Sequence, residues 1–135
     1  MFEQDYLMRI IAQLLGGIRR SMERAAGEED PDGAARMLDM AVGDATDLDG
    51  EALLSLAPES MATILQVSGV DPHLTEHIAR SLLLSARYYS EAGNGEMADL
   101  RASQARALAE AYGHELSDDA VSDEELEAFL EEAGE

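Results

Sequence analysis

Three side chains near the middle of the chain have the types and spacing of a zinc site. His73, Glu76 and His77 lie within the stretch VDPHLTEHIAR, residues 70–80. On a helix, histidines four residues apart share one face and can ligate a single zinc ion, and the glutamate between them can act as a base. Hydrolysis by a zinc-bound water is the chemistry that such a site performs.

These residues also resemble the H-x-x-E-H signature of the inverted zincin peptidases, which implies a zinc-dependent hydrolase. Three observations oppose that implication. The motif directly follows Asp71-Pro72, a helix start. No pattern selects a third ligand, and the peptidase fold is a larger α/β domain. The chain also lacks a P-loop, a G-x-S-x-G motif and a dinucleotide-binding glycine set. We therefore expect no enzyme activity, catalytic residue, cofactor or metal, and keep the zinc hydrolase as the third alternative.

The composition favours a single all-helical domain. The chain has 135 residues, of which 46% are hydrophobic, enough to form one core. Aromatic residues make up only 4% of the chain, so leucine, isoleucine, alanine and methionine must fill that core. Alanine and leucine favour helices, while residues that favour strands are scarce.

The net charge of −20 restricts the partners that we expect. All nine basic residues are arginines, and phosphate backbones and anionic membranes repel so acidic a chain. We therefore expect neither nucleic acid nor a membrane as a partner. The absence of cysteine excludes disulfides and thiolate sites. The sequence shows neither the order of features of a signal peptide nor a stretch of about 20 apolar residues, so we expect a cytoplasmic protein.

Local signals predict a series of helices. Asp71 and Pro72 are an N-cap and a first helical residue, and Ser122 with Glu125 forms a capping box. The segment GDATDLDGE lacks two ligands of a calcium loop, so Asp49 is interpreted as an N-cap. Helices are expected at residues 2–26, 34–42, 50–56, 58–68, 72–92 and 95–112, with a short acidic helix after Ser122 that carries Leu126, Phe129 and Leu130.

Residues 78–113 resemble a tetratricopeptide repeat, a 34-residue helix-turn-helix unit. The stretch departs from the repeat where Ala102 replaces an aromatic residue and Gly95 replaces another, and the closing proline is absent. The resemblance implies an all-α, right-handed stack of antiparallel helix pairs. The apolar periodicity and the capping box add an N-terminal amphipathic helix and a short acidic C-terminal helix. The matching positions are Leu82, Ala86, Tyr89, Gly93, Ala98 and Ala105.

The opening MFEQDYLMRIIAQLL resembles an uncharacterised family of small helical bacterial proteins that begin M-F-x-x-D-Y-x-x-R-x-I. That resemblance implies no biochemical activity. We expect one helical domain over residues 1–114, followed at residues 115–135 by an acidic tail with a short docking helix.

The first functional hypothesis is a protein–protein interaction module. If the repeat register holds, Arg80 and Arg87 flank Leu83 and Ser90 on the concave side, which suits a protein or peptide ligand with an acidic group or a C-terminal carboxylate. The acidic segment Ser122–Glu132 of the same chain could occupy that groove.

The second hypothesis is a structural homo-oligomer. A stripe on the N-terminal helix, formed by Leu7, Ile11, Leu14 and Ile18, could pair with a second copy in a two-fold dimer. Alternatively, the stripe packs on residues 34–68 of the same chain. Gly16-Gly17 in the same helix indicates either a local bend or a close crossing with a neighbouring helix.

Overall fold

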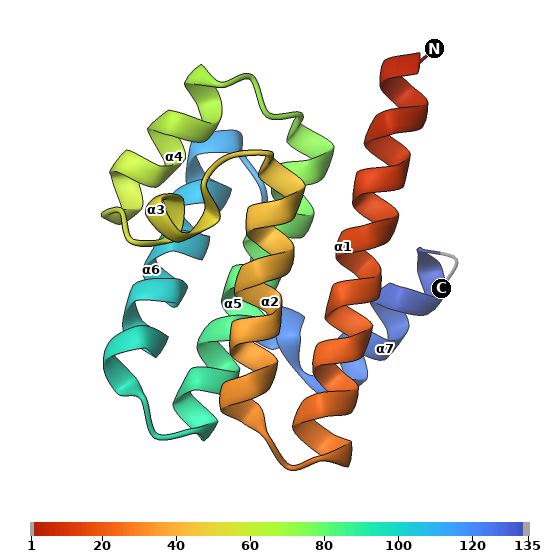
Figure 1. Cartoon of the computed structure of the whole chain (residues 1–135), viewed down its shortest axis with the longest axis vertical. Coiled ribbons are helices and arrows are strands. Elements are labelled where there is room, and N and C mark those ends of the chain that lie inside the picture. Colours follow the sequence, from red (N-terminus) through yellow and green to blue (C-terminus); the bar gives the residue numbers. More distant parts are fainter. Residues whose placement is uncertain (1, 134–135) are drawn as a thin grey trace.

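The computed structural model describes residues 2–133, and every regular element among them is a helix (Figure 1). The predicted all-α class is therefore confirmed. None of the helices in this described part is both long and apolar enough to cross a membrane. The elements are α1 (Phe2–Gly27), α2 (Pro31–Thr46), α3 (Gly50–Leu54), α4 (Pro58–Val67), α5 (Pro72–Glu91), α6 (Gly95–Tyr112), the 3-10 helix η1 (Asp118–Val121) and α7 (Asp123–Glu132).

Side-chain caps and glycines set most helix ends as the sequence predicts. The carboxylates of Asp49 and Asp71 each accept a backbone hydrogen bond from the first turn of the following helix. Gly93 and Gly113 follow α5 and α6 with φ angles of 83° and 72°, in the left-handed region that only glycine adopts without strain. Gly93 lies in the short connection between α5 and α6, which form an antiparallel pair (Figure 1).

Helix α2 is longer than predicted at both ends, because residues 31–33 form its first turn and residues 43–46 continue it into the predicted acidic loop. Pro31 occupies the start of the helix, and the Asp30 carboxylate accepts a 3.0 Å bond from the backbone N–H of Gly33. Arg24 of α1 donates a 2.9 Å bond to the same carboxylate. Both bonds lower the pKa of Asp30 below its ordinary value, and they tie the end of α1 to the start of α2.

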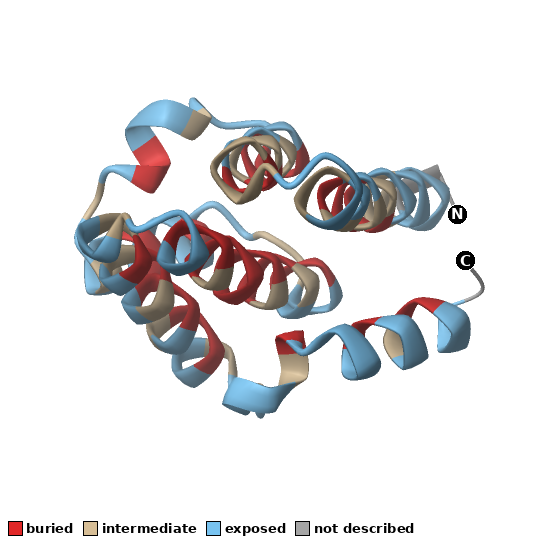
Figure 2. Ribbon diagram, turned by 90° about the horizontal axis from the view of Figure 1, so that it is seen from below, coloured by how far each residue is buried: buried red, intermediate tan, exposed pale blue. Residues whose placement is uncertain are grey.

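Helix α5 is the central element of the core, and α1, α2 and α6 pack around it (Figures 1 and 2). Its apolar side chains are buried on nearly every side, because each neighbouring helix covers a different part of its surface. The largest fully buried residues of the molecule include Leu14, Ile18, Leu38, Met61, Leu65, Ile78, Leu82, Leu84, Tyr88, Leu108 and Leu126.

Two glycine contacts allow helix α2 to lie close to its neighbours. A Cβ added to Gly17 of α1 would stand 2.9 Å from the Cβ of Ala41 in α2, so Gly16-Gly17 provides a close helix crossing within an unbroken α1. A Cβ on Gly43 would stand 2.9 Å from the Cα of Gly50, where α2 meets the start of α3. Larger residues at Gly17 or Gly43 would push α2 away from its neighbours.

The chain after α6 returns along the bundle, and we call η1 and α7 together the tail segment (residues 118–132). Figure 2 shows the buried residues of this segment turned toward the helices above it. Val121, Leu126 and Leu130 are buried and belong to the same apolar cluster as the core of the bundle. The tail segment is thus packed on the body of the protein through a few apolar side chains.

Candidate docking face on helix α5

The four residues predicted to bind a partner lie along one side of α5, and we call them the docking face: Arg80, Leu83, Arg87 and Ser90. Leu83 is buried, the two arginines are half-buried and Ser90 is exposed. Their spacing of three, four and three residues places them on one face of a helix. Because α5 is the central helix of the core, it holds these side chains in a fixed row.

The tail segment covers the two arginines of the docking face. Arg80 Nη1 donates a 3.2 Å bond to the carbonyl of Ala120, and Arg87 Nη1 donates a 2.7 Å bond to that of Val121. Arg87 also forms a 2.9 Å ion pair with Asp123. The Arg80 guanidinium lies over the ring of Phe129, 4.0 Å from its centroid. A third arginine, Arg106 of α6, pairs with Asp118 of η1.

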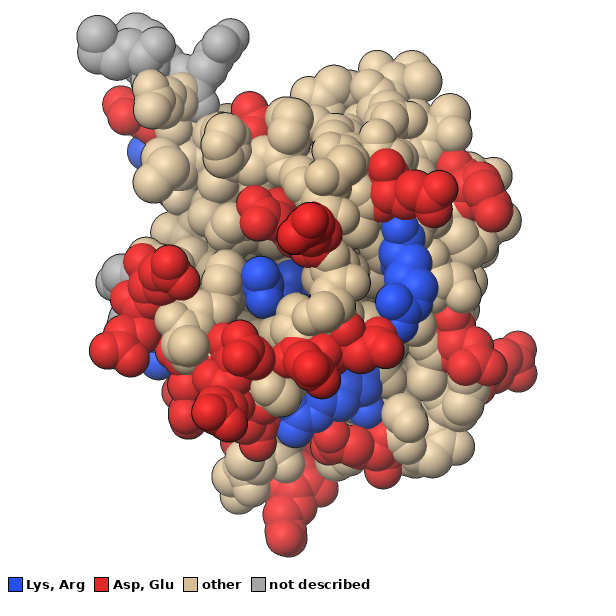
Figure 3. All heavy atoms as spheres, turned by 180° about the vertical axis from the view of Figure 1, so that it is seen from behind, with Lys and Arg blue, Asp and Glu red and all other residues tan. Residues whose placement is uncertain are grey.

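The part of the docking face from Leu83 to Ser90 remains partly open. Leu83 and Ser90 line a shallow groove of about 370 Å³ between α5, α6 and η1. Ala98 and Ala102 of α6 form its opposite wall, because their small side chains leave space beside α5. Figure 3 shows arginine atoms exposed on one side of the molecule as separate patches, each bordered by acidic groups.

The two arginines of the docking face differ in how well their charges are compensated. Burial alone would lower the pKa of Arg87, but its bonds to Glu91 and Asp123 outweigh burial and raise that pKa. Burial lowers the pKa of Arg80 despite the attraction of nearby acids, and its buried Nε has no hydrogen-bond partner. Arg80 is therefore a half-buried cation whose hydrogen-bonding capacity the tail segment satisfies only in part.

The residues of the H-x-x-E-H motif do not converge in the first turns of α5. The side chain of His73 is 81% exposed. His77 is half-buried, lies edge-on to Phe129 of α7 with ring centroids 5.5 Å apart, and has its Nδ1 3.0 Å from the carbonyl of His73. Burial lowers the pKa of His77. Among residues 2–133, no three His, Cys, Asp or Glu side chains gather where they could hold a metal ion.

The stripe predicted for self-association lies partly in the core of the same chain. Leu14 and Ile18 are 1% and 0% exposed, because they face the chain's own core where α1 packs on α2 and α5. Leu7 and Ile11 are only half-buried. Leu14 and Ile18 therefore pack within their own chain, as in the alternative interpretation of the stripe. Leu7 and Ile11 lie nearer the exposed start of α1.

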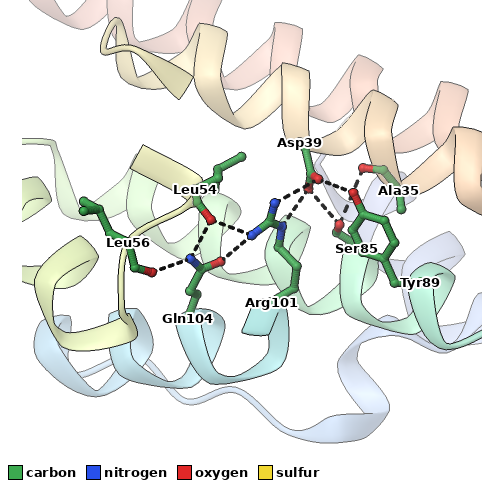
Figure 4. A network of polar contacts seen from close by, with 8 residues as sticks. All are labelled: Ala35, Asp39, Leu54, Leu56, Ser85, Tyr89, Arg101 and Gln104. Carbon is green, nitrogen blue, oxygen red and sulfur yellow. Dashed lines mark hydrogen bonds and ion pairs between the residues drawn. The ribbon is translucent and has the colours of Figure 1, made fainter. Parts of the chain in front are cut away.

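A buried polar network, which the sequence analysis missed, joins α2, α5 and α6 (Figure 4). The carboxylate of Asp39 accepts bonds from Arg101 Nε at 3.1 Å and from Tyr89 Oη at 2.6 Å. Ser85 Oγ donates to it at 2.8 Å. Burial, together with the hydrogen bond from Tyr89 to the Asp39 carboxylate, raises the pKa of Tyr89 well above its ordinary value. We call this set the Asp39 network.

The Asp39 network extends to the loop after α3. Arg101 Nη1 donates to the carbonyl of Leu54 and to Gln104 Oε1, and Gln104 Nε2 donates to the carbonyls of Leu54 and Leu56. One signal could have revealed it, since Arg101 and Gln104 occupy the buried face of α6 together with Ala98 and Leu108. Polar residues at such positions need buried partners. The polar groups of the network bond to one another and link α2, α5 and α6. The network therefore fixes the positions of α5 and α6, which carry the docking face.

Comparisons with protein-family models, with curated proteins and with solved structures find no match to this chain.

Proposed function

We propose that this protein is a tetratricopeptide-like protein–protein interaction module that binds an acidic, amphipathic segment on the docking face of α5 and α6. The observation that carries this proposal is the way the tail segment lies on the docking face. It offers backbone carbonyls to Arg80 and Arg87, a carboxylate to Arg87 and an aromatic ring to Arg80. The tail segment is thus the resident occupant of a surface suited to ligands of the same chemistry.

The distribution of energy in this contact favours exchange. Burial of a leucine side chain contributes about 1.5–3 kcal/mol, so Leu126 and Leu130 supply most of the affinity. Asp123 is 70% exposed, and an ion pair at such a site contributes about 1 kcal/mol or less. The arginines therefore select acidic ligands and set their direction, while a few apolar residues hold them. A partner helix with a similar apolar row could replace the tail segment.

The repeat resemblance supports the same proposal. Ala98 and Ala105, which match the small residues of the repeat, are buried in the core. Such repeats bury a continuous core when about three units stack. We propose that α1–α2 and α5–α6 are two such pairs in a right-handed stack, joined where α2 packs on α5, with α4 against α6 and the tail segment across the α5–α6 pair.

The test uses the whole chain with a specific protease site inserted in the loop between Leu116 and Ser117. After cleavage, we expect the tail fragment to stay bound and to exchange with a labelled synthetic peptide of residues 117–133. Fluorescence anisotropy measures the affinity, and circular dichroism checks that the body remains folded. We expect the double variant Arg80→Ala, Arg87→Ala to bind the peptide at least tenfold more weakly.

The matched control is Arg36→Ala, which removes an exposed arginine that pairs with Asp32 of the same helix. We expect it to leave the affinity unchanged. The proposal is contradicted if the peptide fails to bind a folded, cleaved body, or if Arg36→Ala weakens binding as much as the double variant does.

A further inference from the structure

Helix α1 extends beyond the helix beside it. It has 26 residues whereas α2 has 16, and a loop of three residues joins them, so α1 is ten residues, or about 15 Å, longer. Figure 1 shows its N-terminal part rising past the end of α2. We call these first ten residues, Phe2–Ile11, the α1 overhang.

The apolar surface of the overhang is wider than the part that the rest of the chain covers. At 100° per residue, its apolar side chains from Tyr6 to Ile11 span an arc of about 200°, whereas a surface helix of a globular protein usually shows about 100°. The row nearest the core is half-buried, but Tyr6 and Met8 on its two flanks are 56% and 59% exposed. The apolar residues of this arc are Tyr6, Leu7, Met8, Ile10 and Ile11.

A groove of about 910 Å³ runs beside the overhang. Its opposite wall is the loop between α4 and α5 with the first turns of α5, where Val70 and Leu74 supply apolar surface. Met8, Ile11 and Leu15 line it from the side of α1. The groove therefore offers apolar surface beside the α1 overhang, which is itself apolar over an unusually wide arc.

The charge distribution selects the occupant. The chain carries −20, so two copies repel over most of their surfaces, but the overhang carries only Glu3, Asp5 and Arg9, a net charge of −1. An antiparallel pair of overhangs centred on Leu7 would set Asp5 of one copy near Arg9 of the other. One two-fold operation would then cover the apolar flank of both copies, with opposite charges at the rim.

We propose that the α1 overhang and its groove form the interface of a two-fold homodimer, in which each copy receives the overhang of the other. This surface replaces the predicted stripe that included Leu14 and Ile18, and it is separate from the docking face. Because the interface is apolar and the remaining surfaces are acidic, association should strengthen with salt, which screens the repulsion between the two copies.

Sedimentation equilibrium of the full chain at low and high salt tests the proposal. The expected result is a mass twice that of the 14.6 kDa chain, with a dissociation constant that falls as salt rises. Met8→Glu should raise the dissociation constant at least tenfold, because it places a carboxylate in the interface. The control Val67→Glu adds the same charge at an apolar residue that is 82% exposed on α4. It should leave the mass unchanged, and the added repulsion should raise the dissociation constant only slightly.

The absence of natural cysteines allows a second measurement. Met8→Cys should give a covalent dimer with a short thiol-to-thiol cross-linker, and Val67→Cys should not. A monomeric mass for the wild-type chain at the highest concentration and salt would overturn the proposal. So would equal effects of Met8→Glu and Val67→Glu, or cross-linking of the Val67→Cys variant alone, because either result would place the contact elsewhere.

Discussion

Two polar contacts join distant parts of this chain, and they are built in different ways. In the Asp39 network, the Arg101 side chain is 6% exposed and each of its three guanidinium nitrogens donates to an acceptor. At the docking face, Arg80 keeps an unpartnered Nε, and the tail carboxylate that pairs with Arg87, that of Asp123, is largely exposed. A satisfied buried network favours one arrangement of the helices, whereas a partly satisfied contact can accept another ligand.

The largest effect should follow from removing the charge at the centre of the Asp39 network. Asp39→Ala leaves Arg101 buried without its counter-charge, and such a loss costs about 3–5 kcal/mol of the free energy of unfolding. Urea denaturation followed by circular dichroism measures this loss. Asp32→Ala is the control, since it removes an exposed carboxylate from the same helix, and we expect it to change stability little. Equal effects of the two variants would show that the network does not stabilise the fold.

A smaller and more local effect should follow from shortening the main apolar anchor of the tail segment. Leu126 is fully buried, and Leu126→Ala should cost about 3 kcal/mol of tail docking. Because the tail segment packs through few side chains, the loss should appear as faster hydrogen exchange in α7 and η1 while α5 and α6 stay protected. The control Val67→Ala, at an exposed residue, should leave exchange unchanged. Uniform loss of protection throughout the chain would contradict a separable tail.

The same comparison explains what could be predicted from the sequence. Helix ends depend on adjacent residues, so Asp71, Pro72 and Gly93 predict the bounds of α5 closely. The row of Arg80 and Arg87 also follows from helical spacing, and the acidic tail was recognised as a candidate occupant because its charge opposes theirs. Helix caps, helical spacing and opposite charges can be predicted from the sequence because they need no knowledge of the fold.

Contacts between residues far apart in the sequence could not be predicted in the same way. Arg101 meets Asp39 across 62 residues, and no local pattern states which acid among many will face a given arginine. The apolar stripe of α1 likewise does not reveal whether α2 or a second copy will cover it. Leu14 and Ile18 are buried because α1 packs on both α2 and α5, and local signals in α1 do not encode either contact.

Removing a single hydroxyl should sharpen the distinction between the two contacts. Tyr89→Phe deletes the 2.6 Å bond to Asp39 but leaves both carboxylate oxygens bonded to Arg101. The expected cost is about 1.5 kcal/mol of the free energy of unfolding, typical of one hydrogen bond to a charged group. Urea denaturation should show this loss in a single transition, because the network belongs to the core. Tyr6→Phe, at an exposed tyrosine, should show none.

The smallest effect concerns pH and the docking of α7. His77 lies against Phe129, and burial lowers its pKa below the ordinary value of 6.5. Between the folded and the ordinary pKa, the released or unfolded state binds more protons than the docked state, so docking weakens as pH falls. The contribution is complete above about pH 6.5 and is lost as pH decreases through the folded pKa.

Hydrogen exchange of α7 between neutral and mildly acidic pH, corrected for the intrinsic exchange rate, should therefore show weaker docking at the acidic end. His77→Gln should flatten this dependence, because glutamine does not titrate, while His73→Gln, at an exposed position, should preserve it. If both variants kept the dependence, His77 would not be its source. The contact between His77 and Phe129 would then serve packing alone.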